Sequence, residues 1–413
     1  MNYLRKFIII FSILSYTNFI GLIDSDKVSI GIPLRDYALA FIILYLFYRF
    51  YNYFYLLNRY IKYNYLRPVL IISALATLYI VTMPLRGDIT FVQGFKAGRQ
   101  FLTLLLAIVI YEDIYYTKSS KFIFTTITIL GIVYTFLSIL NNFIPDTIAS
   151  IFSGGDILVS EDAWDSGSAR YVLRGNSGIY FIHVSYAIYL FKYLYYRDKT
   201  DLYLLLLFSL GILMHGYRSP LVVFAITSIV IIFLRLKIKQ SMNYLFVIFF
   251  VGVFIYFTES LVGKNIIMSK FESAYNELSG EYSGSFESRL DRSMNYQIPM
   301  FLKSKWIGYG FVHKESKLAH SIGHEGDGRY SLYYIDFGYG TLLNYFGIFG
   351  SLIFIFTIIK TLNYSFFYSK KERKYYKDSI IVFIVAFLII NYSFALLESL
   401  NGLLPLSAIL GFT

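Results

Sequence analysis

The chain is a series of apolar runs, most of them long enough to cross a lipid bilayer. A helix needs about 20 residues to span about 30 Å of hydrocarbon, and in lipid its backbone groups must be hydrogen-bonded internally. No stretch shows the alternating pattern of a transmembrane β-strand. The sequence therefore predicts an all-α polytopic integral membrane protein with about 11–12 transmembrane helices. We expect spans at 7–23, 37–57, 68–83, 99–117, 121–144, 176–196, 202–214, 219–234, 242–261, 336–360 and 379–397, with 400–413 as a twelfth span or a re-entrant end.

The distribution of charge predicts the orientation of these spans. Only 15% of the residues are charged, against about 25% in soluble domains. The basic residues concentrate in alternate connections, in "RYIKYNYLR", "YYRDK", "RLKIKQ" and "KKERKYYK". Cytoplasmic loops carry the excess of Lys and Arg, so we expect the N-terminus inside. The net charge of +11 is then a topology signal, and we expect no nucleic-acid partner.

Two connections on the predicted outer side are too polar and too long to be simple turns. They divide the chain into five parts. Residues 262–335 form a large extracytoplasmic loop in which "KNIIMSKFESAYNELSG" and "FESRLDRSMNYQIPMFLKS" have helical spacing. The five parts are N-terminal transmembrane helices at 1–144, an outer loop at 145–175, central transmembrane helices at 176–261, the large loop at 262–335 and C-terminal transmembrane helices at 336–413.

An arginine interrupts the apolar sequence in "LMHGYRSPLVVF", a tight connection on the predicted outer side. Arg218 at this position fits a side chain that reaches the lipid headgroups. Arg174, Arg289 and Arg292 are also predicted outside, however, and a guanidinium fork matches a phosphate bidentately. If the four converge, they form a pyrophosphate site at the lipid–water boundary. For Arg174 and Arg292 the alternative is surface ion pairing with nearby acids.

Two residues are candidates for a general base. Asp336 lies where the large loop meets the next span, and its alternative role is to cap that helix. His324 has an imidazole that titrates near neutral pH, and its alternative is a solvated loop histidine. The stretch "HSIGHEGDG" also spells His-x-x-x-His, but its glycines disfavour the helix that such a zinc site needs. We therefore expect no metal site, and the absence of Cys excludes thiolate chemistry.

Four stretches together resemble the O-antigen polymerase and ligase superfamily of bacterial envelope glycan assembly. They are "RGNSGIYFIHVSYA" at 174–187, "MHGYRSPLVVF" at 214–224, "SRLDRSMNYQIPMFLKSKWIGYGF" at 288–311 and "DFGYGTLLNYFGIFGSLIFI" at 336–355. Their order, spacing and predicted topology agree with the family over about residues 165–360. Ligases of this superfamily usually place a His-Asn pair about eleven residues before the exit glycine. This sequence has Asp336 there, which favours the polymerase branch, while His320 and His324 leave the ligase interpretation open.

The resemblance implies an enzyme of lipopolysaccharide or capsule biosynthesis in the bacterial cytoplasmic (inner) membrane. Such an enzyme transfers a growing glycan from undecaprenyl diphosphate to another lipid-linked repeat unit, at the periplasmic or exterior face. Arg218 and Arg289 would hold the diphosphate, supported by Arg174 and Arg292. No cofactor is expected, because the diphosphate lipid is already activated. A chain-length regulator and a flippase are the expected membrane partners. The alternatives are a ligase that transfers the glycan to lipid A-core and a lipid-linked glycan flippase or other transporter.

Overall fold

The computed structural model describes residues 2–17, 33–52, 66–87, 89–143, 180–214, 218–235, 293–311, 316–319, 338–367 and 374–390. Helices dominate these segments, and no strand occurs among them. The prediction of an all-α fold is therefore confirmed. The helices are α1 (Asn2–Tyr16), α3 (Leu34–Asn52), α5 (Leu66–Thr82), α6 (Phe91–Leu102), α7 (Leu106–Thr117), α8 (Lys121–Phe143), α10 (Tyr180–Tyr196), α11 (Lys199–Met214), α12 (Arg218–Arg235), α16 (Ile298–Lys303), α18 (Gly338–Phe367) and α19 (Lys374–Ile390), with short 3-10 or π turns η2 (Pro84–Arg86), η3 (Thr103–Leu105) and η5 (Ser293–Gln297).

Three helical stretches in the described part of the chain are long and apolar enough to cross a membrane. They are Phe91–Thr117, Lys121–Leu140 and Tyr339–Lys360. Shorter apolar helices cover Val69–Thr82 and Val223–Leu234. These stretches agree with the predicted polytopic architecture. The expected span at 242–261 and the terminal stretch at 400–413 lie outside the described residues.

One predicted span begins in the wrong place. The prediction started it at residue 99, whereas the helix begins at Phe91. The Thr90 hydroxyl accepts a hydrogen bond from the Gln93 backbone N–H at 3.2 Å, and the Gln93 side chain accepts one from the Thr90 N–H at 3.0 Å. This capping box satisfies two amides that a helix start leaves open. Hydropathy missed this first part because Lys96 and Arg99 interrupt its apolar face.

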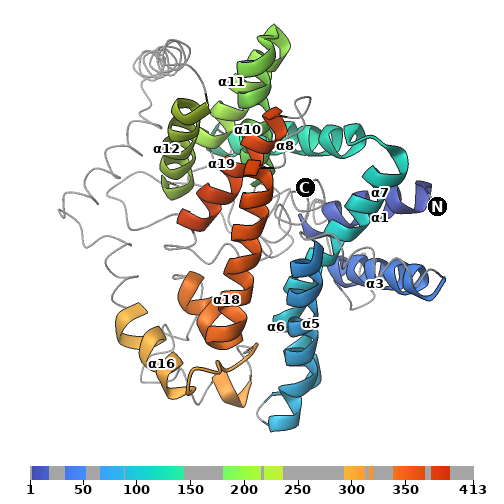
Figure 1. The fold of residues 1–413 in the computed structure, drawn as a ribbon, viewed down its shortest axis with the longest axis vertical. Coiled ribbons are helices and arrows are strands. Elements are labelled where there is room, and N and C mark those ends of the chain that lie inside the picture. Colours follow the sequence, from blue (N-terminus) through green and yellow to red (C-terminus); the bar gives the residue numbers. More distant parts are fainter. Residues whose placement is uncertain are drawn as a thin grey trace.

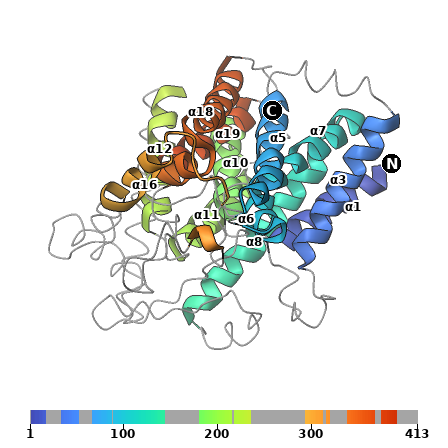
Figure 2. The ribbon, with the colours of Figure 1, turned by 90° about the horizontal axis from the view of Figure 1, so that it is seen from below.

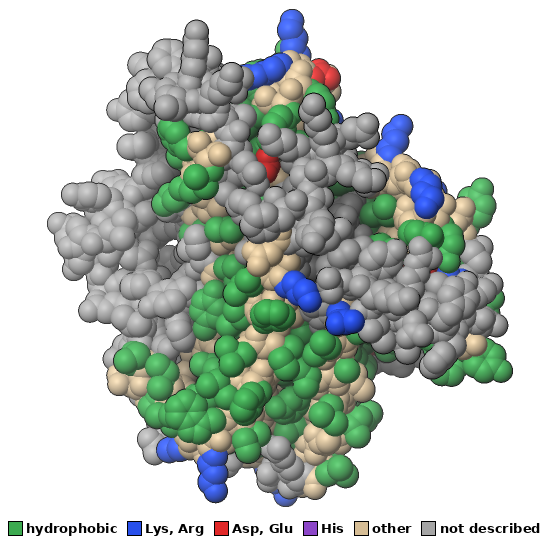
Figure 3. Space-filling view, viewed as in Figure 1, with side chains coloured by type: hydrophobic (Ala, Val, Ile, Leu, Met, Phe, Trp, Pro, Cys, Tyr) green, Lys and Arg blue, Asp and Glu red, His purple; other side chains and the backbone are tan. Residues whose placement is uncertain are grey.

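The helices form two groups with α18 between them. Figures 1 and 2 show α1, α3, α5, α6 and α7 on one side and α10, α11, α12 and α19 on the other. In the lower half of Figure 3, hydrophobic side chains cover most of the described surface, with Lys and Arg at its lower edge. On α18, Phe349, Leu352 and Phe356 are 79%, 57% and 62% exposed. Their helical spacing makes a continuous apolar stripe, as a lipid-facing helix requires.

Two ion pairs, one buried and one partly exposed, join helix ends that the charge pattern assigns to the same side of the membrane. Arg49 on α3 contacts Glu112 on α7 with an N–O distance of 3.1 Å. Lys192 on α10 contacts Asp201 on α11 at 2.8 Å. Charged side chains within membrane proteins are rare and generally paired. The contacts thus group the helix ends as the predicted alternation requires.

The pair on α3 and α7 supports a first prediction. Tyr45 on α3 also donates its hydroxyl to Glu112. We expect Tyr45→Phe to lower the free energy of unfolding by about 0.5–2 kcal/mol, because one hydrogen bond to a buried charge is lost. Thermal unfolding in detergent measures the effect. Tyr51→Phe is the matched control, since Tyr51 lies on the same helix and is 80% exposed. An equal loss in both variants would contradict the assignment.

Candidate functional site

The starts of α12 and α18 meet the C-terminal half of α19. In the first turn of α18, Tyr339 donates its hydroxyl to the Leu388 carbonyl of α19 at 2.6 Å. In the second turn of α12, the ring of Phe224 lies 6.0 Å from that of Phe383 on α19. Both helices begin at or just after residues that we predicted to belong to the site. Their first turns are therefore fixed against one helix.

The start of α10 reaches the same region, because α10 runs antiparallel to α19. Tyr196 at the end of α10 packs on Tyr375 near the beginning of α19, with centroids 5.4 Å apart. Further along, Ser379 donates its hydroxyl to the Ala187 carbonyl at 2.8 Å. The first turn of α10 therefore lies toward the end of α19. The starts of α10, α12 and α18 thus surround one end of α19.

A histidine that the sequence analysis did not single out lies in this cluster. His183 is in the first turn of α10 and is fully buried. Its ring centroid is 4.5 Å from that of Phe224 on α12 and 5.6 Å from that of Tyr180. The sequence feature that could have pointed to His183 is an imidazole inside an apolar run, in the stretch "RGNSGIYFIHVSYA". A buried titratable group beside the start of α12 is a candidate member of the site.

The helix α18 is broken where the sequence analysis expected one continuous span. Gly347 has φ 65° and ψ −172°, which no helix contains. Residues of the large loop supply hydrogen bonds at the break. The Tyr309 N–H donates to the Asn344 carbonyl at 2.7 Å, and the Ile348 N–H donates to the Trp306 carbonyl at 3.0 Å. The loop thus satisfies backbone groups that the break releases, as buried backbone requires.

Glycines allow the loop and the broken helix to touch. A Cβ on Gly308 would lie 2.6 Å from the Gly347 nitrogen, and one on Gly347 would lie 2.7 Å from the Trp306 carbonyl oxygen. Gly308 also has φ 82°. Gly308 belongs to the stretch "GYG" at 308–310. Its structural role is the close approach of two backbones.

Aromatic side chains hold the end of this loop segment against the first group of helices. Phe311 is fully buried and stacks on Phe101 of α6, with centroids 5.2 Å apart. It meets Phe346 of α18 at 5.4 Å. Gly98 on α6 leaves room for this ring, because a Cβ there would lie 2.6 Å from Phe311 Cε2. The segment 304–311 is therefore anchored between α6 and α18.

The structure describes elements that adjoin three of the predicted site residues in the sequence. Arg218 is the first residue of α12, as its predicted place in a connection before a helix requires. Asn344 on α18 donates its side-chain N–H to the Gln297 carbonyl at 3.3 Å. The turn η5, which follows Arg292 directly, is thereby tied to the helix that begins just after Asp336.

The side chains of the predicted site lie outside the described residues. These are the side chain of Arg218 and the whole of Arg174, Arg289, Arg292, His320, His324 and Asp336. Their convergence stays a prediction. Trp306, in contrast, is among the residues that the structure describes. Its side chain is 52% exposed and its ring stands edge-on to Phe301 at 5.5 Å.

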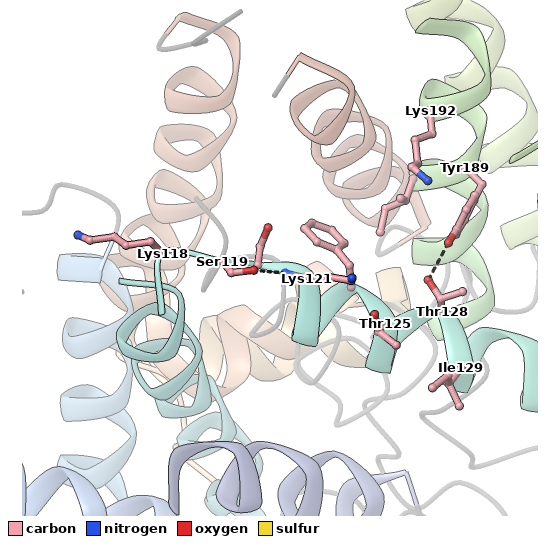
Figure 4. A pocket seen from close by; sticks show the side chains of 11 residues that line it. Lys118, Ser119, Lys121, Thr125, Thr128, Ile129, Tyr189 and Lys192 are labelled. Atoms are coloured by element: carbon pink, nitrogen blue, oxygen red, sulfur yellow. Dashed lines mark hydrogen bonds between the residues drawn. The ribbon is translucent and has the colours of Figure 1, made fainter. Parts of the chain in front are cut away.

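A cavity of about 480 Å³ lies at the other end of α10 (Figure 4). Lys121 and Thr128 on α8 line it together with Tyr189 and Lys192 on α10. The hydroxyls of Thr128 and Tyr189 are 3.2 Å apart. Along the helix, Lys192 is about 13 Å from His183. The cavity is therefore separate from the cluster of helix starts, on the side predicted to face inward.

Two comparisons with known proteins bear on this arrangement. Residues 203–355 match the model of a family described as O-antigen ligase. A comparison with curated proteins found no match. The matched segment includes α12 and the break in α18, and it ends in the apolar stripe of α18. It falls within the region, about 165–360, over which the sequence motifs carried the resemblance.

Proposed function

We propose that this chain, of which residues 203–355 match a family described as O-antigen ligase, polymerises undecaprenyl-diphosphate-linked oligosaccharide repeat units. The product is O-antigen or capsular polysaccharide. The protein acts as a multi-pass membrane glycosyltransferase, with its active site on the outer face of the cytoplasmic membrane. No cofactor is part of the proposal.

The observation that carries the proposal is the cluster of helix starts around the end of α19. Arg218 begins one of these helices, and in the sequence Arg174 lies six residues before the second and Asp336 two residues before the third. Packed helices are a sound basis for a site, because they hold the residues that they carry more precisely than loops do. The proposal places the diphosphate of the donor lipid at this cluster.

The proposed chemistry is one glycosyl transfer. The bond from the sugar's anomeric carbon to the diphosphate oxygen breaks, and the electron pair leaves with the diphosphate. The acceptor hydroxyl forms the new bond to that carbon and gives its proton to a base. Arg218 and Arg289 stabilise the charge that grows on the leaving diphosphate, with Arg174 and Arg292 in support. Asp336 is the first candidate for the base and His324 the second.

A ligase is the second candidate function, and the description of the matching family favours it. It would transfer the finished glycan to lipid A-core. His320 and His324 are the residues that would serve such a reaction. The acidic residue at 336, where ligases of the superfamily usually have His-Asn, is the reason to prefer the polymerase. A lipid-linked glycan flippase remains the third alternative, and a flippase and a chain-length regulator are the proposed partners of the polymerase.

Glycan banding in a deletion strain tests the proposal. We expect chains of a single repeat on the final acceptor, because units still reach the outer face and are still attached. Loss of a ligase would instead leave no repeats on the acceptor and let lipid-linked polymer accumulate. Loss of a flippase would trap repeat units in the cytoplasmic leaflet. Either of these two outcomes would contradict the polymerase proposal.

A further inference from the structure

A small cavity at the junction of α1, α3 and α6 is separate from the proposed catalytic cluster. Its volume is about 70 Å³, which exceeds the space that one water requires. Most of its lining comes from the first turns of α3 and from the middle of α6. The described lining residues are Tyr16, Arg35, Asp36, Leu39, Lys96, Arg99 and Gln100.

The charges around this cavity do not balance. Arg35, Lys96 and Arg99 contribute three positive charges, whereas Asp36 is the one carboxylate among the described lining residues. That carboxylate already forms an ion pair with Arg99. Three positive charges and one negative charge leave a formal excess of two positive charges. An additional anion would offset this excess.

Arg35, unlike Arg99, has no ion-pair partner among the described residues. Its Nε is buried and has no hydrogen-bond partner in the described part of the chain. It also repels the guanidinium of Arg99 electrostatically. A buried N–H donor without an acceptor is costly, since the loss of its hydration is not compensated. A ligand with several acceptor oxygens would supply the hydrogen-bond acceptor that the described residues do not provide for Arg35.

The residues beside the cavity have the pattern of a membrane interface. The α6 helix is amphipathic, and its first residues, Phe91 and Val92, are 56% and 59% exposed. Lys96 is exposed on the next turn. Apolar side chains that face outward beside a lysine are typical of a helix at the membrane interface. The charge pattern of the sequence assigns this end of α1, α3 and α6 to the outer side.

We propose that this cavity binds a phosphate group at the membrane boundary. Arg35 and Lys96 contact the phosphate oxygens, and Arg99 stays paired with Asp36. The shared chemistry of the ligand is a phosphate, which either a membrane lipid or free phosphate can present. The proposal does not depend on the glycosyl transfer, because none of these residues belongs to the catalytic cluster.

Native mass spectrometry of the full chain, released from detergent, tests the proposal. The probe is phosphatidylglycerol, titrated against diacylglycerol as the matched lipid without phosphate. We expect Arg35→Gln/Lys96→Gln to weaken binding of the first phosphatidylglycerol by about tenfold or more, because two charge-assisted contacts are lost. Diacylglycerol binding should stay the same. Competition by inorganic phosphate on the wild-type chain would show that free phosphate uses the site, and its failure would show that the lipid carries the phosphate.

Two further variants keep the result interpretable. Arg197→Gln/Lys199→Gln removes an exposed Arg just after α10 and an exposed Lys at the start of α11, and we expect wild-type binding. Lys96→Gln alone changes only an exposed side chain, so it retains the fold and should show part of the loss. The proposal is overturned if Arg35→Gln/Lys96→Gln binds phosphatidylglycerol as the wild type does. It is equally overturned if the Arg197→Gln/Lys199→Gln control loses the same affinity.

Discussion

Arg218→Ala is expected to lower the rate of glycan polymerisation by about 10²–10³-fold, the usual cost of removing one prepositioned charge donor at a transition state. The residue opens α12, whose second turn is held against α19 by Phe224. Polymerisation requires negative charge to develop on the leaving diphosphate. In the proposed site, a guanidinium that is already in place would stabilise this charge without reorganisation. The measurement is the rate at which purified enzyme extends lipid-linked repeats.

Three variants separate chemistry from folding. Arg218→Lys keeps the charge but loses the bidentate fork, so we expect an intermediate rate. Arg197→Ala removes an exposed arginine at the other end of α10 and should leave the rate unchanged. Asp336→Asn tests the base and should also abolish most of the activity. If Arg218→Ala and Asp336→Asn, both well expressed, retain the full ladder of chain lengths in cells, the assigned site is wrong.

Gly347→Ala is expected to have the largest effect on stability, lowering the free energy of unfolding by about 2–6 kcal/mol. Its backbone conformation is one that essentially only glycine adopts, at a cost of about 1–3 kcal/mol for other residues. The added methyl group would also lie 2.7 Å from the Trp306 carbonyl oxygen. Overpacking of this kind costs about 1–3 kcal/mol. Thermal unfolding in detergent and the monodisperse fraction on size exclusion measure the loss.

Two other glycines give matched controls for the same substitution. Gly87 has φ 81°, but a Cβ there meets nothing within 4 Å, so Gly87→Ala should show only the backbone cost of about 1–2 kcal/mol. Gly94 lies inside α6, and a Cβ there would be 3.5 Å from the Ile80 carbonyl oxygen, an ordinary contact. Gly94→Ala should therefore be neutral or slightly stabilising. A Gly347→Ala protein as stable as Gly94→Ala would show that the loop does not dock at the break.

The proposed site shows which residues the sequence motifs pointed to and which they missed. Arg218 stood out as a candidate because a charged side chain is rare in an apolar stretch. The structure places it at the start of a helix, as expected. His183 was overlooked because an imidazole within an apolar run resembles an ordinary core residue. Its meeting with Phe224 joins residues about 40 positions apart in sequence. The positions of Arg289, Arg292, Arg174, His324 and Asp336 relative to Arg218 stay predictions.

The sequence by itself determined that this protein is a bundle of apolar helices, because lipid leaves the backbone few other ways to satisfy its hydrogen bonds. It also predicted which helix ends face the same side of the membrane, and the ion pairs Arg49–Glu112 and Lys192–Asp201 agree with that prediction for two pairs of ends. Only the tertiary structure decided that α18 breaks at Gly347 and that the loop at 304–311 enters the break. Hydropathy measures each segment alone, whereas a break in a membrane helix is stable only when a distant segment supplies hydrogen bonds to the backbone groups that it releases.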